Sequence, residues 1–299
     1  MQKTLRRYLS DALTPAARAW IRYAPLSAGK PWLWENFHWR ARKFNCRTRH
    51  GSRITGNTED LIQRHLYFFG TWEPNISNWL CAALRPGDCF VDIGANIGHY
   101  SLLASRLVGD SGQVVAVEAA QSIHRLLDGH VALNRRRNIR TVQAAAADLR
   151  GTVKLYPGGA DNIGKTSMIA HDGPVLEVPA LPLTDILKDN EIRRIRVIKI
   201  DVEGAELQVL RGLAPLLERL PRAAEIIMEI SPDLMPDAQR ARAEIFATLR
   251  AHDFRAYVFD NDYGVQTYLQ AAPYKRPVAL TESPPSRAQA DVLFSRAPY

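Results

Sequence analysis

Short apolar runs alternate with longer amphipathic stretches along the chain from residue 86 onward. The runs of strand length are 89–93, 114–118, 142–147, 195–200, 225–230, 256–259 and 291–295. Stretches with helical spacing follow several of them, at 99–108, at 121–134 and from residue 205. Two more apolar runs, 153–156 and 175–180, flank a glycine-rich stretch and predict a small antiparallel pair. Strands that alternate with helices indicate an α/β fold with a mostly parallel sheet, covered by helices on both faces.

Residues 1–80 have a different pattern, which predicts mostly helices with interruptions at Pro15, Pro25 and Pro31. One apolar face of the first helix is formed at helical spacing by Leu5, Tyr8, Leu9, Ala12 and Leu13. We expect this helix to end at Pro15, because a proline inside a helix removes a backbone hydrogen bond.

The distribution of charged and aromatic residues also differs between these two regions. Residues 1–80 contain 13 Lys/Arg, 5 Asp/Glu and all six tryptophans, whereas basic and acidic side chains are equally numerous in residues 81–299. We therefore expect a helical, basic, Trp-rich N-terminal extension or cap at 1–80 and a catalytic domain at 81–299. The mixture of arginine and aromatic side chains in residues 1–60 also suits an anionic membrane surface or a glycolipid, and suits nucleic acid less well.

The cysteines and the absence of long apolar runs bear on the compartment. Cys46, Cys81 and Cys89 form no close pair, so they predict neither a zinc nor a redox motif, and they favour free thiols in a reducing compartment. No run of about 18 apolar residues predicts a membrane span. The N-terminus lacks the apolar segment of a secretory signal. We expect a cytoplasmic protein, with peripheral attachment to a membrane as the alternative.

The segment PGDCFVDIGANIGHYS, residues 86–101, is typical of a nucleotide-binding turn between a strand and a helix. Gly94 and Gly98 allow a tight turn and close approach of a ligand, and Asn96 tolerates a left-handed backbone. Backbone N–H groups at the start of the following helix point into the same crevice. Glu118 lies twenty residues beyond Gly98, at the end of the next strand, where a carboxylate can bind ribose hydroxyls. These features predict a cofactor that contains adenosine.

The loop favours S-adenosyl-L-methionine over a dinucleotide. The dinucleotide pattern G-x-G-x-x-G has its second glycine where Asn96 stands. Asp92 adds a carboxylate beside the loop, which disfavours a pyrophosphate and suits a cofactor with an ammonium and a sulfonium group. An NAD-linked dehydrogenase and an ordinary strand–helix turn are the weaker alternatives.

A second group of acids follows the apolar run 195–200. Asp201 ends this predicted strand, and Glu203 and Glu206 come directly after it. Capping of the next helix would explain one such acid, because carboxylates are favoured at a helix start. Three exceed what capping requires, and ligands of open α/β sheets bind at this end of the strands. Mg²⁺ is an alternative occupant, although we predict no metal.

Taken together, these segments resemble the FkbM-type methyltransferases. The segments that carry the resemblance are GTWEPNISNWLCAALRPGD, FVDIGANIGHYSLLAS, VVAVEAAQSIHRLLDGHVALN, AAAADLRGTVKLY and IRVIKIDVEGAELQVLRGL, within about residues 66–232. One departure is Ala120, where many members of the family have proline. The resemblance implies a Rossmann-like class I methyltransferase sheet of seven mostly parallel strands.

The resemblance also implies roles for individual residues. The residues implied in binding S-adenosyl-L-methionine are Glu73, Asp92, Gly94, Asn96, Gly98, Glu118 and Asp148. Among these, Glu118 would hold the ribose, Asp148 would contact the adenine, and Glu73 would lie near the amino-acid end.

Members of the family commonly methylate hydroxyl groups, so the resemblance implies O-methylation of a sugar, a glycolipid or another small-molecule acceptor. Asp201 is the hypothesised general base or orienting group, and Glu203 and Glu206 would hold the acceptor or support Asp201. His99 is a weaker candidate base. A nucleic-acid methyltransferase that uses the basic N-terminal region is the alternative enzyme, and a cofactor-binding module without turnover is the alternative outside enzymes.

Overall fold

The chain folds into two compact units, which are described separately below. The computed structural model describes residues 2–39, 41–159, 161–163, 166, 174–235, 237–261, 264–269, 277–279 and 289–298. The N-terminal unit comprises Met1–Pro74, Ala160–Asn162 and Asp262–Tyr274. The sheet unit comprises Asn75–Gly159, Ile163–Asn261 and Lys275–Tyr299. Two later segments thus belong to the N-terminal unit, although the sequence predicted a single boundary at residue 80.

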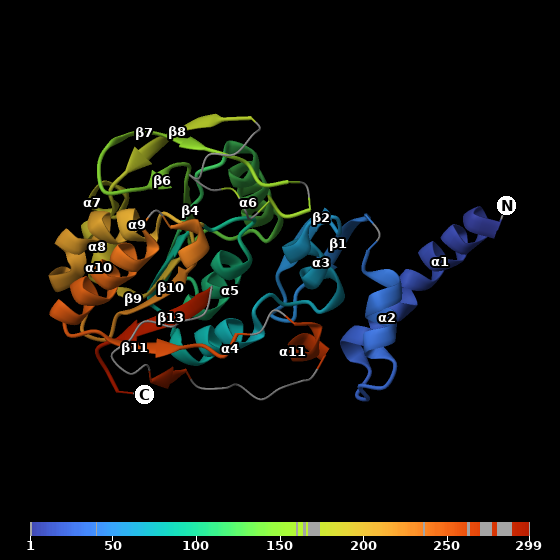
Figure 1. Cartoon of the computed structure of the whole chain (residues 1–299). Coiled ribbons are helices and arrows are strands. Elements are labelled where there is room, and N and C mark those ends of the chain that lie inside the picture. The colour runs from blue at the N-terminus through green and yellow to red at the C-terminus, as the bar shows by residue number, and fades with distance from the viewer. Residues whose placement is uncertain are drawn as a thin grey trace. The chain divides into compact units, whose positions relative to one another are not determined.

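The sheet unit is built on one mixed sheet with the strand order β12-β11-β13-β10-β9-β3-β4-β5 (Figure 1). Its strands are β3 (Cys89–Ile93), β4 (Gln113–Val117), β5 (Ile139–Val142), β9 (Ile195–Ile200), β10 (Glu225–Ile230), β11 (Arg255–Val258), β12 (Val278–Ala279) and β13 (Ala290–Ser295). Neighbours from β5 to β10 pair in parallel, whereas β13 runs antiparallel to both β10 and β11. The predicted seven-stranded, mostly parallel sheet is confirmed, and the two-residue β12 extends it at one edge.

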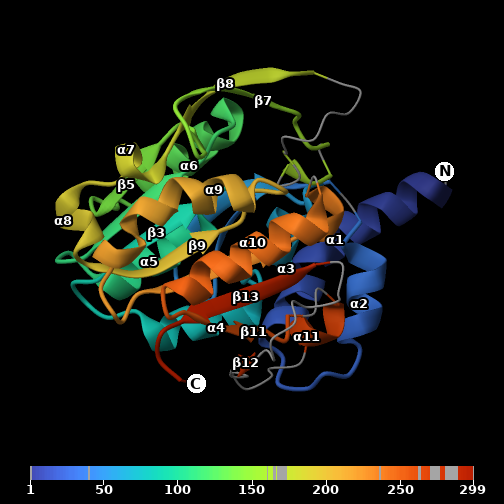
Figure 2. The same cartoon turned by 60° about the vertical axis from the view of Figure 1, so that its left-hand side comes forward.

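Helices cover both faces of this sheet, as Figure 2 shows. They are α4 (Pro74–Ala83), α5 (His99–Val108), α6 (Gln121–Leu133), α7 (Leu183–Ile186), α8 (Asp189–Ile192), α9 (Glu206–Leu213), α10 (Ala238–Ala251) and the short 3₁₀ helices η2 (Ala214–Arg219) and η3 (Pro232–Leu234). Because helices lie on both sides, every side chain of β3, β10 and β13 is buried. Continuous apolar runs, rather than alternating ones, therefore encode the central strands.

A second, three-stranded sheet has the order β6-β8-β7. Its strands are β6 (Ala145–Ala146), β7 (Gly151–Leu155) and β8 (Leu176–Leu181). The predicted antiparallel pair is confirmed, because β7 and β8 pair antiparallel from Gly151–Ala180 to Leu155–Leu176. The predicted strand 142–147 is wrong as one element: its start ends β5 in the main sheet, and Ala145–Ala146 pairs with β8 instead.

The N-terminal unit contains α1 (Gln2–Tyr23), α2 (Lys30–Phe37), α3 (Leu61–Phe68) and α11 (Val265–Leu269). The prediction that the first helix ends at Pro15 is wrong, because α1 continues through this residue. Ala17 and Ile21 are buried on one side of α1 beyond the proline. Tertiary packing of this face offsets the backbone hydrogen bond that the proline removes. Within the described residues, no helix has the length and apolar content required to cross a bilayer.

The N-terminal unit also contains a β-hairpin, which the prediction of a helical extension missed. Strand β1 (Lys43–Arg47) pairs antiparallel with β2 (Arg53–Asn57). Side chains of β1 alternate between exposed and buried, with Phe44 and Cys46 inside. Alternation with a period of two is the signal of a half-buried strand. The basic residues between the apolar ones hid that signal.

Candidate active site

The turn between β3 and α5 has the backbone that its sequence requires. Gly94, Asn96 and Gly98 have φ angles of 79°, 49° and 87°. A Cβ atom on Gly94 would lie 1.8 Å from the carbonyl oxygen of Asp201, so only glycine lets the loop pack against the end of β9. The Asn96 side-chain oxygen accepts a hydrogen bond from the Ile97 N–H at 2.7 Å, which stabilises the left-handed residue.

Glu118, directly after β4, holds this loop from the other side. Its Oε2 accepts from the Asn96 N–H and its Oε1 from the Ala120 N–H, both at 2.9 Å. Burial raises the pKa of Glu118 to about 7, and these backbone donors oppose that shift. Each carboxylate oxygen keeps acceptor capacity beyond one backbone bond, which leaves room for a hydroxyl donor.

Asp92, near the end of β3, is almost completely buried. Its Oδ2 accepts a hydrogen bond from the Ser101 hydroxyl of α5 at 2.5 Å. Burial raises the pKa of Asp92, and the nearby Lys199 ammonium acts in the opposite direction. The carboxyl group therefore joins β3 to the start of α5 as well as placing an acid beside the loop.

Asp201 follows β9 at the same edge of the sheet. Its N–H donates to the Ile93 carbonyl at 3.0 Å, and its Oδ2 lies 2.6 Å from Nζ of Lys199. The Lys199 side chain is buried, and its ammonium lies 4.8 Å from the centre of the Tyr100 ring. Lys199 was not predicted, because a lysine within the run IRVIKI does not reveal which neighbours its ammonium meets.

The turn after β9 has two residues with left-handed backbone, Glu203 at φ 52° and Gly204 at φ 99°. A Cβ atom on Gly204 would lie 2.3 Å from the Leu234 carbonyl oxygen, so a side chain cannot be accommodated there. The Gly204 N–H donates to Oε1 of Glu206 at 2.9 Å. Glu206 has no exposed surface, and burial raises its pKa to about 7. Its Oε2 is buried without a hydrogen-bond partner among the described residues.

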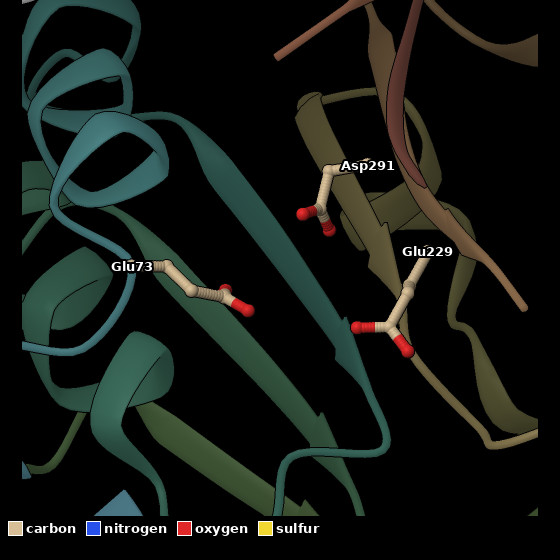
Figure 3. Close-up of side chains that lie close together, drawn as sticks. All are labelled: Glu73, Glu229 and Asp291. Atoms are coloured by element: carbon tan, nitrogen blue, oxygen red, sulfur yellow. The ribbon is translucent and has the colours of Figure 1, made fainter. Parts of the chain in front are cut away.

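Two acids that the sequence analysis missed lie on neighbouring strands. Glu229 of β10 and Asp291 of β13 are direct cross-strand partners, and Figure 3 shows their carboxyl groups. Both side chains are buried. The Ser231 hydroxyl donates to Glu229 at 3.0 Å, and the Asn261 amide donates to Asp291 at 2.7 Å. These donors satisfy part of the hydrogen-bonding capacity of the two buried carboxyl groups, which burial would otherwise leave unmet.

Glu229 also completes an acidic group with the predicted residues. Carboxylate oxygens of Asp201, Glu203 and Glu229 all lie within 4.8 Å of one another, close enough to share a cation or one hydroxyl-bearing ligand. The parallel register, which places Met228 beside Ile200, brings Glu229 level with Asp201. Only the pairing of β9 with β10 creates this neighbourhood, because the two acids are distant from each other in sequence.

The other predicted residues are placed as follows. His99 begins α5, is buried, and has its Nε2 3.3 Å from the Ser77 hydroxyl. Asp148 is partly exposed just beyond β6. Glu73, also drawn in Figure 3, belongs to the N-terminal unit; it is buried, and its N–H donates to the Tyr268 hydroxyl of α11 at 3.2 Å.

The fold and this strand-end site define a Rossmann-like class I methyltransferase. Residues 92–256 match the family described as the Methyltransferase FkbM domain. The chain therefore belongs to the FkbM methyltransferase family, and its cofactor is S-adenosyl-L-methionine, as the sequence predicted.

Individual relatives share less than a third of their aligned residues with this chain. The chain is 29% identical over 201 residues to the 31-O-demethyl-FK506 methyltransferase FkbM of Streptomyces tacrolimicus, covering 57% of this chain and 74% of that protein. It is 29% identical over 163 residues to the methyltransferase sdnD of Sordaria araneosa, covering 44% and 62% respectively. A solved FkbM methyltransferase from Methylobacillus flagellatus aligns with a TM-score of 0.43 and 13% identity, covering 77% of this chain and 54% of that one.

Proposed function

We propose that this enzyme transfers the methyl group of S-adenosyl-L-methionine to a hydroxyl oxygen of a sugar, a glycolipid or another small natural-product acceptor. The observation that carries the proposal is the acidic group of Asp201, Glu203 and Glu229, whose oxygens lie within 4.8 Å of one another. A neutral hydroxyl is a weak nucleophile, so a proton acceptor within hydrogen-bond reach accelerates its attack. The name of the Streptomyces tacrolimicus relative, which describes an O-demethyl compound, also favours oxygen as the acceptor atom.

The residues proposed to bind the cofactor are Glu73, Asp92, Gly94, Asn96, Gly98, Glu118 and Asp148. The chemistry of the described groups fits, because Glu118 has carboxylate oxygens with spare acceptor capacity beside the glycine loop. A buried acceptor without a donor, Oε2 of Glu206, suits an ammonium or hydroxyl group of a ligand. When bound, S-adenosyl-L-methionine supplies an electrophilic methyl group on a sulfonium.

Asp201 is the proposed general base or orienting group. Lys199 holds its Oδ2 at 2.6 Å, which leaves Oδ1 to accept the proton of the attacking hydroxyl. Glu203 and Glu206 are proposed to hold the acceptor or to support Asp201, and Glu229 adds a further carboxylate near Asp201 and Glu203. Alignment of the hydroxyl with the methyl carbon supplies most of the rate enhancement in such a displacement. His99 is the weaker candidate base, since its imidazole is already directed to Ser77.

The charge of the N-terminal region supports an anionic or lipid-linked acceptor. Residues 1–80 contain 13 Lys/Arg against 5 Asp/Glu, which favours an anionic or lipid-linked acceptor at an anionic membrane surface or glycolipid. Nucleic acid is the alternative acceptor for the same positive charge, and it is less favoured. The proposed location is the cytoplasm, with peripheral attachment to a membrane.

The decisive experiment replaces Asp201 by asparagine and measures methyl transfer from radiolabelled cofactor to a panel of sugar, glycolipid and polyketide alcohols. The kcat of Asp201→Asn should fall about 10²- to 10⁴-fold, with cofactor affinity retained, because a positioned base contributes that much. EDTA should leave the wild-type rate unchanged, because no metal is proposed.

Asp189→Asn is the matched control, since Asp189 is an exposed aspartate that pairs with Arg219 on the surface of the same unit. Its kcat should equal that of the wild type. Near-full turnover by Asp201→Asn would exclude the base role. Activity on RNA or DNA alone would show that the acceptor is a nucleic acid rather than a sugar, glycolipid or small natural product. Loss of activity in EDTA would show that the acidic group binds a cation.

A further inference from the structure

Helix α1 has exposed apolar side chains next to its buried face. Ala17 and Ile21 are buried against the rest of the N-terminal unit. Leu13, Trp20 and Tyr23 recur at helical spacing along the edge of this buried face and are 53%, 47% and 68% exposed. The apolar stripe of α1 is therefore wider than the part that folding buries, and its exposed edge is free to meet a partner.

Helix α2 repeats this arrangement. Trp34 and Phe37 are buried, whereas Trp32 of α2 and Trp39, two residues after its end, are 61% and 60% exposed. Asn36 stands between the two exposed rings: its amide donates to the Trp32 carbonyl at 2.7 Å, and its own carbonyl accepts from the Trp39 indole at 3.0 Å. The Trp39 ring is therefore held in place outside the fold.

The turn that joins α1 and α2 also has an exposed apolar side chain and is hydrogen-bonded to α1. Leu26 in this turn is 64% exposed, and the Trp20 indole donates to the Ala28 carbonyl at 3.1 Å. We use the name aromatic ridge for Leu13, Trp20, Tyr23, Leu26, Trp32 and Trp39. Six of the ten large apolar side chains that are exposed among the described residues thus lie within one short stretch of the chain, 13–39. Concentration of exposed apolar side chains in one segment favours an interaction surface over singly scattered residues.

A basic face adjoins the end of α1. Lys43 and Arg47 are exposed on β1, and Arg53 is exposed on β2 directly opposite Arg47. Arg47 and Arg53 therefore place two positive charges side by side on this face of the hairpin. Arg22, in the last turn of α1, donates to the Arg47 carbonyl and thereby ties the helix to the hairpin. We call Lys43, Arg47 and Arg53 the basic strand face.

We propose that the aromatic ridge and the basic strand face dock this protein on a bilayer that contains anionic phospholipids. Indole and phenol rings sit at the level of the headgroups, where one end of the ring is apolar and the other is wet. Each basic residue near an anionic surface adds about fivefold to the affinity. Nucleic acid matches the charge but offers no apolar interior for Leu13 and Leu26.

The docking proposal rests on the proposed function in one respect only: a lipid-linked acceptor would explain why this enzyme binds a membrane. Binding to a bilayer requires no methyl transfer and no cofactor, so the two proposals fail independently. A glycolipid acceptor would lie in the same two-dimensional layer as the docked enzyme, which raises its effective concentration.

The test is co-sedimentation of the full chain with vesicles of phosphatidylcholine, with and without phosphatidylserine. Wild-type protein should bind the phosphatidylserine vesicles, and its affinity should fall with added salt because the charges are exposed. The triple variant W20A/W32A/W39A should lose about tenfold or more of this affinity. The triple variant K43Q/R47Q/R53Q should lose about a hundredfold on phosphatidylserine vesicles and nothing on pure phosphatidylcholine.

Leu149→Ala is the matched control, because Leu149 is a 72% exposed apolar residue of the sheet unit. It should bind vesicles like the wild type. Calorimetry with S-adenosyl-L-methionine checks that each variant is folded, and the single variant Trp32→Ala replaces the aromatic triple variant should the latter unfold. No binding of wild type to phosphatidylserine vesicles would overturn the proposal, as would unchanged binding by both triple variants. Binding of RNA in place of vesicles would assign the surface to nucleic acid.

Discussion

At the scale of single residues, two buried glutamates of the candidate site make the stability of the folded protein depend on pH. Burial raises the pKa values of Glu118 and Glu206 to about 7 in the folded protein, from 4.5 for the ordinary side chain. Between these values the folded chain binds more protons than the unfolded chain. Their contribution to stability is therefore fully present below pH 4.5 and is lost as the pH rises through 7.

Glu206→Gln isolates one of these groups. The amide stays neutral and its oxygen can still accept from the Gly204 N–H. The variant should match the wild type near pH 4.5 and exceed its free energy of unfolding at pH 8 by up to about 3 kcal/mol. Urea unfolding at both pH values measures this difference. A difference that does not change with pH would show that the charge of Glu206 is not what burial penalises.

At the scale of elements, the glycine loop fixes how β3 and β9 approach each other. Gly94 has a φ angle of 79°, and its α-carbon faces the Asp201 carbonyl so closely that a Cβ would lie 1.8 Å from that oxygen. One contact therefore determines both the shape of the glycine loop and the position of the proposed base. Gly204 is restricted in the same way, because a Cβ atom there would clash with the Leu234 carbonyl oxygen.

Gly94→Ala should displace the turn after β9 and reduce cofactor affinity and turnover together. Its stability should fall by about 2 kcal/mol or more, because a left-handed backbone and a steric clash add. Gly129→Ala in α6 is the control, since a Cβ there meets no atom within 4 Å; it should raise stability by about 0.5 to 1 kcal/mol. Thermal unfolding and calorimetry on both variants measure these effects. Normal cofactor binding by Gly94→Ala would refute the role given to this contact.

At the scale of the whole molecule, the cofactor and the fold should stabilise each other. Saturating S-adenosyl-L-methionine at about 100 times its Kd should add about 2.7 kcal/mol to the stability of the folded state, whereas NAD should add nothing. Thermal unfolding with each ligand measures the shift. Glu118→Ala should abolish the shift, because it removes the proposed ribose contacts. A well-folded wild-type protein that shows no shift with S-adenosyl-L-methionine would contradict the assignment of the binding residues.

The sequence by itself determined the features that depend on local pattern. Apolar runs separated by helical stretches predicted the sheet, because burial on both faces requires continuous apolar strands. Gly94, Asn96 and Gly98 predicted the turn, because left-handed backbone favours these residue types. Asp201 and Glu118 were predicted as site residues because ligand-binding acids often follow directly after strands, and the structure places both acids there.

Only the tertiary structure decided which side chains meet across strands. Lys199, Glu229 and Asp291 lie inside apolar runs, where nothing local distinguishes a site residue from a buried ion pair. Parallel register brings Glu229 level with Asp201, and antiparallel register sets it opposite Asp291. The hairpin of β1 and β2 and the passage of α1 through Pro15 also escaped prediction, because long-range packing outweighed local propensity there.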